Sequence, residues 1–189
     1  MMTQTIEVDD TIAPSLTAPA NKTGATHVEG CDTSAITGLT YSESAVTITA
    51  AQLSTAGGSA SDACGISSIS YQDSKTGSCP IVVTRTFTAK DVCLNTTSKA
   101  QTIEVDDTTA PSLTAPANKT GVNHVEGCDT SAISGLTYSE SAVTITAAQL
   151  STAGGSASDA CGLSCITYKD SKSGSCPIVV TRTFTAKDL

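Results

Sequence analysis

Residues 4–92 of this chain recur as residues 101–189, and this internal repeat constrains the fold more than any other feature. In the alignment, 79 of the 89 positions are identical at an offset of 97 residues. A period of that length matches a whole domain and is too long for one unit of a solenoid. The 189 residues are therefore predicted to form two domains of one fold.

Short runs of alternating apolar and polar residues predict that each domain is all-β. The longest run, Ile81–Ala89, places Val83 and Phe87 on one face, interrupted by Arg85. Arg85 either extends its head group to solvent or pairs with a buried acid. The capping-box spacing of Thr49 and Gln52 predicts a helical turn over Ala50–Thr55. The other predicted strands are Ser15–His27, Ile36–Glu43, Val46–Ile48, Ile66–Asp73 and Lys99–Val105. About seven short strands per repeat are typical of an immunoglobulin-like β-sandwich.

The stretch Thr102–Pro111, TIEVDDTTAP, is predicted to join the two domains, and it occurs first as Thr5–Pro14. It reads as a strand followed by paired acids and an extended residue before proline. We therefore expect two tandem immunoglobulin-like domains joined by a short acidic linker. The predicted boundaries are 1–10 for the last strand of a preceding repeat, 11–107 for the first domain, and 108–189 for a second domain that lacks its final strand.

The unmatched first strand has two explanations. In one, the chain was cut from a longer array of repeats. In the other, Thr3–Asp10 of one molecule completes the second domain of another, which gives a head-to-tail fibre. An incomplete sandwich has an open strand edge, so such completion is physically favourable.

Charge and motifs argue against several functions. A net charge of −8 disfavours binding to nucleic acid. The sequence contains no nucleophile elbow, phosphate-binding loop, zinc-protease motif or dinucleotide-binding motif. His27 and His124 are interpreted as surface turn residues, and no stretch is long and apolar enough to span a membrane. Neither an enzyme, a nucleic-acid partner nor a membrane span is predicted.

Acidic residues are predicted to converge where one domain meets the next. In an immunoglobulin-like sandwich, the linker acids should approach a loop and a turn of the following domain. Four carboxylates would repel one another unless they bound a cation, and oxygen ligands favour Ca²⁺. The alternative is that the paired aspartates only cap a strand in solvent. The predicted calcium ligands are Asp9, Asp10, Asp62 and Asp91 for the first domain and Asp106, Asp107, Asp159 and Asp188 for the second.

Eight cysteines in a chain rich in Thr and Ser suggest an oxidising compartment, such as the extracellular space. Cys79 and Cys93 flank one long strand and are roughly 45 Å apart at about 3.3 Å per residue, which is beyond disulfide reach. In an immunoglobulin-like sandwich Cys64 and Cys93 should lie at one end of the strands and Cys31 and Cys79 at the other. We therefore predict the pairs Cys31–Cys79 and Cys64–Cys93, with Cys128–Cys176 in the second domain. Cys161 pairs locally with Cys165, or one of the two forms an intermolecular bond.

The segments SASDACG, CPIVVTRTFTAKDVCLN and TIEVDDTTAP together resemble hyalin-type (HYR-like) repeats, in particular the tandem copies in large secreted cell-surface adhesins of Bacteroidetes. The resemblance covers nearly the whole chain. It implies an extracellular, non-enzymatic, immunoglobulin-like module with a role in cell adhesion. It also raises Cys31–Cys64 as an alternative disulfide. Two departures are Leu94, where such repeats usually have glycine, and Cys165, where the first copy has Ser68.

The sequence thus predicts a structural stalk or spacer repeat of an extracellular adhesin or surface fibre. Its predicted partners are neighbouring repeats or further copies of itself, joined head to tail. The alternative is a module whose loops bind a ligand or glycan. Nearly identical loops in both copies, and an aromatic content of 3%, weigh against that alternative.

Overall fold

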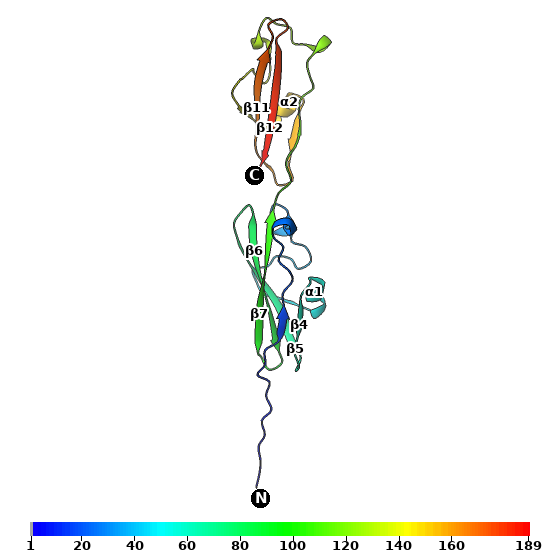
Figure 1. The fold of residues 1–189 in the computed structure, drawn as a ribbon, viewed down its shortest axis with the longest axis vertical. Coiled ribbons are helices and arrows are strands. Elements are labelled where there is room, and N and C mark those ends of the chain that lie inside the picture. Colours follow the sequence, from blue (N-terminus) through cyan, green and yellow to red (C-terminus); the bar gives the residue numbers. More distant parts are fainter. Residues whose placement is uncertain (1) are drawn as a thin grey trace. The chain divides into compact units, whose positions relative to one another are not determined.

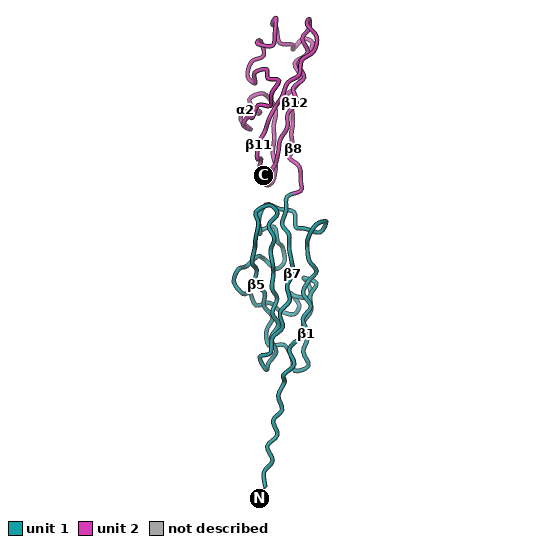
Figure 2. The backbone as a smooth tube through the Cα atoms, turned by 60° about the vertical axis from the view of Figure 1, so that its left-hand side comes forward, with its two compact units in different colours: residues 1–107 teal, residues 108–189 magenta. Residues whose placement is uncertain are grey.

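A computed structural model describes residues 2–189. The chain divides into two compact units, Met1–Asp107 and Thr108–Leu189 (Figure 2). Both units consist mainly of β-strands, which confirms the all-β prediction. No helix within residues 2–189 is long and apolar enough to cross a membrane.

The first unit contains a five-stranded sheet and a separate pair of strands (Figure 1). The sheet order is β2-β7-β6-β5-β3, and its strands are β2 (Val28–Glu29), β3 (Val46–Ile48), β5 (Ile66–Thr76), β6 (Ile81–Asp91) and β7 (Thr96–Asp106). The pair consists of β1 (Ser15–Thr17) and β4 (Ser59–Ser61). β2 pairs with β7 in parallel, and the other pairs are antiparallel. The three long central strands, joined by tight turns, form the frame of the unit.

Local sequence accounts for the helix α1 (Ala50–Thr55). The Thr49 hydroxyl accepts from the Gln52 amide at 3.1 Å, and the Gln52 side chain accepts from the Thr49 amide at 2.8 Å. This is the expected capping box, and it satisfies donors that a helix start leaves unpaired. Leu53 points from α1 into the core and is fully buried. Shorter 3-10 helices are η1 (Gly24–Thr26) and η2 (Thr33–Ala35).

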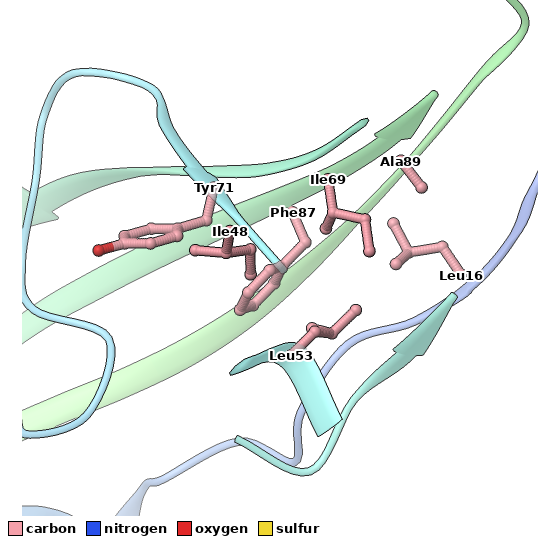
Figure 3. Packing of buried hydrophobic residues seen from close by; sticks show 7 residues of the cluster. All are labelled: Leu16, Ile48, Leu53, Ile69, Tyr71, Phe87 and Ala89. Carbon is pink, nitrogen blue, oxygen red and sulfur yellow. The ribbon is translucent and has the colours of Figure 1, made fainter. Parts of the chain in front are cut away.

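Two apolar clusters make the core of the first unit. One lies between the long strands, α1 and the β1–β4 pair, and Figure 3 shows its buried members: Leu16, Ile48, Leu53, Ile69, Tyr71, Phe87 and Ala89. The other brings together Ile36, Ile81, Val83, Ile103 and Val105. β7 supplies two of the five residues of this second cluster. Burying an aliphatic side chain of this size contributes about 1.5–3 kcal/mol.

The structure resolves the role of Arg85, which pairs with a buried acid. Its guanidinium donates to both carboxylate oxygens of Asp73 at 2.8 Å, and Arg85 and Asp73 are each 3% exposed. Arg85 also donates to the Thr40 carbonyl at 3.1 Å and lies over the Tyr71 ring. Asp73 further accepts from the Ser42 amide. A fully hydrogen-bonded buried pair of this kind is costly to break.

The second unit repeats this arrangement with fewer strands. Its sheet has the order β12-β11-β9, and a separate pair joins β10 to β8. One apolar cluster is present, with Leu136, Ile145, Leu150, Ile166 and Tyr168 buried. The elements are β8 (Ser112–Thr114), η3 (Gly121–Asn123), η4 (Thr130–Ala132), β9 (Val143–Ile145), α2 (Ala147–Thr152), β10 (Ser156–Ser158), β11 (Leu163–Ser173) and β12 (Val179–Asp188).

Some predicted elements are wrong. Thr5–Val8 is not a strand, and its Ile6 and Val8 side chains are 73% and 94% exposed. Ile36–Glu43 is not a strand either, because its backbone accepts hydrogen bonds from side chains. Tyr71 and Arg85 both donate to the Thr40 carbonyl. Val28–Glu29, which is not among the predicted strands, forms β2.

Candidate functional site

The strand ladder brings separate loops of the first unit to one end of the sheet. Ile66 opens β5 opposite Asp91, the last residue of β6. Cys64 therefore lies just before β5 where Cys93 lies just after β6, as predicted. At the other end, Val28 and Glu29 pair with the last two residues of β7, and the Gly30 amide donates to the Asp106 carbonyl.

Asp10, Asp62 and Cys64 form a compact group at the first of these ends. Each offers one possible ligand atom, and these atoms lie within 4.8 Å of one another. Asp62 is held by a turn in which its Oδ1 accepts from the Cys64 amide at 2.8 Å. Oδ1 of Asp10 accepts from the Ile12 amide at 3.0 Å. These short local bonds fix both carboxylates beside the thiol.

One oxygen of this group lacks a good protein partner. Oδ2 of Asp10 is buried and makes no hydrogen bond of acceptable geometry, although the Cys64 thiol, a weak donor, lies against the same carboxylate. Hydrogen bonding to Asp10 raises the pKa of the Cys64 thiol, and the nearby charges of Asp10 and Asp62 add to this. A buried carboxylate oxygen without a donor is costly, so a cation at this point would relieve it.

Asp91 has a supporting role next to this group. It is fully buried, and its two carboxylate oxygens accept from the backbone and side-chain nitrogens of Asn95, both at 2.9 Å. The Asn95 side chain also donates to the Asp10 carbonyl at 2.9 Å. Asp91 thus anchors Asn95, and Asn95 fixes the backbone that carries Asp10.

Only two of the four acids that were predicted to bind calcium in the first domain therefore lie together. Asp10 and Asp62 come together, Asp91 lies behind them with its oxygens occupied, and Asp9 is exposed and outside the group. Cys64 belongs to the group, which the sequence interpretation missed by assigning this thiol to a disulfide. The signal was present in the sequence, because an aspartate two residues before Cys64 is the spacing of an Asx turn.

The acids predicted for the second domain have the sequence positions of those of the first, although Asp9 lies outside any strand. Asp106 ends β7, and Asp107 is the final residue of the first unit. Oδ1 of Asp159 accepts from the Cys161 amide at 2.8 Å, which repeats the turn at Asp62. Asp188 ends β12.

The predicted disulfides are corrected by the structure. Cys31 and Cys161 are the two cysteines in disulfide form, and the free thiols are Cys64, Cys79, Cys93, Cys128, Cys165 and Cys176. The expected pairs Cys31–Cys79, Cys64–Cys93 and Cys128–Cys176 are therefore not formed, nor are Cys31–Cys64 and Cys161–Cys165.

Carboxylates lie against two of these free thiols. The Cys79 thiol contacts Oδ1 of Asp106 at 3.5 Å, and this hydrogen bond raises the pKa of the thiol. The Cys64 thiol likewise lies against Asp10.

Each histidine is held by its own turn. Nε2 of His27 lies 2.8 Å from Oε2 of Glu29, and its Nδ1 lies 2.6 Å from the Gly24 carbonyl. The hydrogen bond to Glu29 is the main cause of the raised pKa of His27. His124 makes the equivalent contacts with Glu126 and Gly121. These contacts agree with the interpretation of both residues as surface turn residues.

Comparison of the chain with known protein families, curated proteins and solved structures finds no match.

Proposed function

We propose that the chain is a structural stalk or spacer repeat of an extracellular adhesin or surface fibre. The strongest support is that the same set of strands occurs twice and that its arginine and histidine side chains make contacts within it. Arg85 binds Asp73, Arg182 binds Asp170 at 2.7 Å, and each histidine holds its own turn. Duplicating such a unit adds length to a protein without adding a new binding specificity.

The proposed architecture of each unit is an immunoglobulin-like sandwich. In the first unit the long sheet and the β1–β4 pair enclose Leu16, Leu53 and Phe87 between them (Figure 3). Aligned sheets packed over an apolar layer define that class of fold. An extracellular location is in keeping with the two cysteines in disulfide form.

The spacer role is tested by changing the number of repeats. Chains with two, three and four copies of residues 11–107 are imaged by negative stain, and their contour lengths are measured. A spacer gains the same length with each copy. A contour length that stays constant or collapses as copies are added would contradict the proposal. Strong binding of the two-copy chain on a glycan array would favour the ligand-binding alternative.

The role assigned to the Asp10–Asp62 group is to bind Ca²⁺ where the acidic linker enters the first unit. Carboxylate oxygens are the ligands that calcium prefers, and Oδ2 of Asp10, which is buried without a hydrogen-bond partner, would be one of them. The thiol of Cys64 is softer, so it stays outside a calcium coordination sphere and would join that of a metal such as zinc. Asp107 and Asp159 are the sequence equivalents in the second copy.

Thermal unfolding with calcium, with zinc and with a chelator tests this site. Calcium at about 100 times its dissociation constant should add about 2.7 kcal/mol to the stability. Asp10→Asn and Asp62→Asn should lose the gain, whereas Asp9→Asn, at an exposed residue outside the group, should keep it. Stabilisation by zinc alone that disappears in Cys64→Ser would contradict the choice of calcium.

Head-to-tail joining by strand donation is the proposed mode of assembly. Ile6 and Val8 are exposed apolar residues of a strand-like sequence, and among residues 2–189 β12 has a paired strand on one side only, which supports this mode.

A further inference from the structure

The outer edge of β12 is open. In the first unit, β6 is paired on one side with β5 and on the other with β7. Its counterpart β12 is paired with β11 only, and no strand within residues 2–189 occupies its other side. Unpaired edges of this length are templates for a further strand.

The apolar face of β12 is also incompletely covered. Val83, Phe87 and Ala89 on β6 are all fully buried, whereas Val180, Phe184 and Ala186 at the same positions of β12 are only partly buried. The second cluster of the first unit has no counterpart among the described residues of the second. The missing part of this core is the part that β7 supplies.

The segment Gln4–Asp9 has the sequence needed to fill this edge. It reads QTIEVD, which is identical to Gln101–Asp106, the last six residues of β7. Ile103 and Val105 are 2% and 1% exposed in β7, whereas Ile6 and Val8 are 73% and 94% exposed. Figure 1 shows this segment as an extended tail leaving the first unit. The same residues are thus core in one place and solvent-exposed in the other.

Within the described residues, the segment of the second unit that is equivalent to Lys22–Glu29 also lacks a partner strand corresponding to β7. In the first unit, Lys22 exchanges backbone hydrogen bonds with Thr102 and Glu104, and Val28–Glu29 pairs with the end of β7. The equivalent Val125–Glu126 forms no strand, and Val125 is 39% exposed. A donated strand would therefore be held on both of its edges.

We propose that Gln4–Asp9 of a second copy of this chain adds to β12 as an antiparallel strand in the register of β7. That register places Ile6 opposite Val180, Val8 opposite Ile178, and Gln4 opposite Arg182, by analogy with Ile103, Val105 and Gln101 opposite Val83, Ile81 and Arg85. The inference rests on the proposed structural role and names the partner and the contact that extend it. Because donor and acceptor are different surfaces, the contact is heterologous and generates a linear chain of molecules.

A second molecule is a better donor than the same one. Asp10 is tied through Asn95 to the end of the first unit where β7 begins, and the second unit follows the opposite end of β7. The eleven residues of β7 span about 35 Å at about 3.3 Å per residue. Donation within one molecule would require the second unit to return along that length, whereas a second copy carries no such constraint.

Light scattering of the 189-residue chain across a range of concentrations tests the inference. We expect oligomers that grow with concentration in the parent chain. Association should be roughly 100-fold weaker in the double variant Ile6→Asp, Val8→Asp, since two apolar anchors are lost. The matched control is Glu7→Gln, whose side chain alternates to the opposite face of the strand. A parent chain that stays monomeric, or a double variant that associates equally well, would overturn the inference.

A complementation experiment separates donor from acceptor. A chain that begins at Asp10 should be monomeric, and a peptide of residues 3–10 should slow amide exchange in Val179–Thr185. The same peptide with Ile6→Asp and Val8→Asp should not. Protection by both peptides, or by neither, would overturn the assignment of register. Monomers that still gain length with each added repeat would leave the spacer proposal intact, so the two ideas fail separately.

Discussion

The two units share nearly all of their sequence and differ in how completely they bury it. β7 is present in the first unit, and there Val83 and Phe87 are fully buried; their counterparts Val180 and Phe184 keep part of their surface in solvent. Identical residues on identical strands thus reach different degrees of burial because one neighbouring strand is present or absent.

The effect of β7 extends beyond the residues that it touches in the sheet. Val28–Glu29 forms β2 only where β7 is available as a partner, since Val125–Glu126 remains irregular. The His27 side chain beside β2 is 18% exposed, compared with 59% for His124. The final strand of the repeat therefore organises a segment almost 80 residues earlier in the chain, as well as the cluster around Val83.

The largest expected effect comes from giving the second unit its missing strand. Appending the sequence of residues 93–107 after Leu189 should raise the free energy of unfolding of the second unit by about 3–6 kcal/mol, since two aliphatic side chains become buried. Native-state hydrogen exchange would show the gain in β11 and β12. An extension carrying aspartate at the positions of Ile103 and Val105 is the control. Equal stability of the two extended chains would contradict the central place given to β7.

Breaking the buried ion pair should cost more in the first unit than in the second. Asp73→Ala leaves the Arg85 guanidinium buried without its partner, which typically costs 3–5 kcal/mol. Asp170→Ala should cost less, because the Arg182 side chain is already 19% exposed and water can solvate it. Chemical denaturation of the two single variants measures both costs, and equal costs would show that the added exposure of Arg182 has no consequence.

The cluster around α1 and α2 should behave alike in the two units. Leu53 and Leu150 are each 0% exposed, and neither cluster contains a residue of β7. Leu53→Ala and Leu150→Ala should each cost about 2–5 kcal/mol. A clearly smaller cost for Leu150→Ala, measured by the same denaturation, would mean that the absence of β7 loosens the whole second unit.

Local patterns predicted local structure well in this chain. The capping box fixed α1, and alternation over Ile81–Ala89 found β6 and its buried face, because in both cases the interacting residues are close in sequence. The pattern over Ile36–Glu43 failed because its backbone is bonded by Tyr71 and Arg85, which lie more than 30 residues away.

The candidate site was predicted only in part for the same reason. Strand order was enough to place Asp10 near Asp62, but side-chain direction decided the rest. Asp91 accepts hydrogen bonds from Asn95, and the Cys64 thiol lies against Asp10 without bonding to Cys93. Repetition of the sequence also concealed the exposure of Ile6 and Val8, because their copies in β7 are buried.

The smallest expected difference between the units is in the titration of their histidines. The pKa of each is raised above 6.5, mainly by the hydrogen bond to Glu29 or Glu126, and Asp106 adds to the effect only at His27. A raised folded-state pKa stabilises the fold below the unfolded pKa, and this contribution is lost as pH rises through the folded value. NMR titration should give both histidines a pKa above 6.5, and Glu29→Gln should lower that of His27 while leaving His124 unchanged. If Glu29→Gln left the pKa of His27 unchanged, the contact with Glu29 would not stabilise the turn, and the lower exposure of His27 would be due to β2 alone.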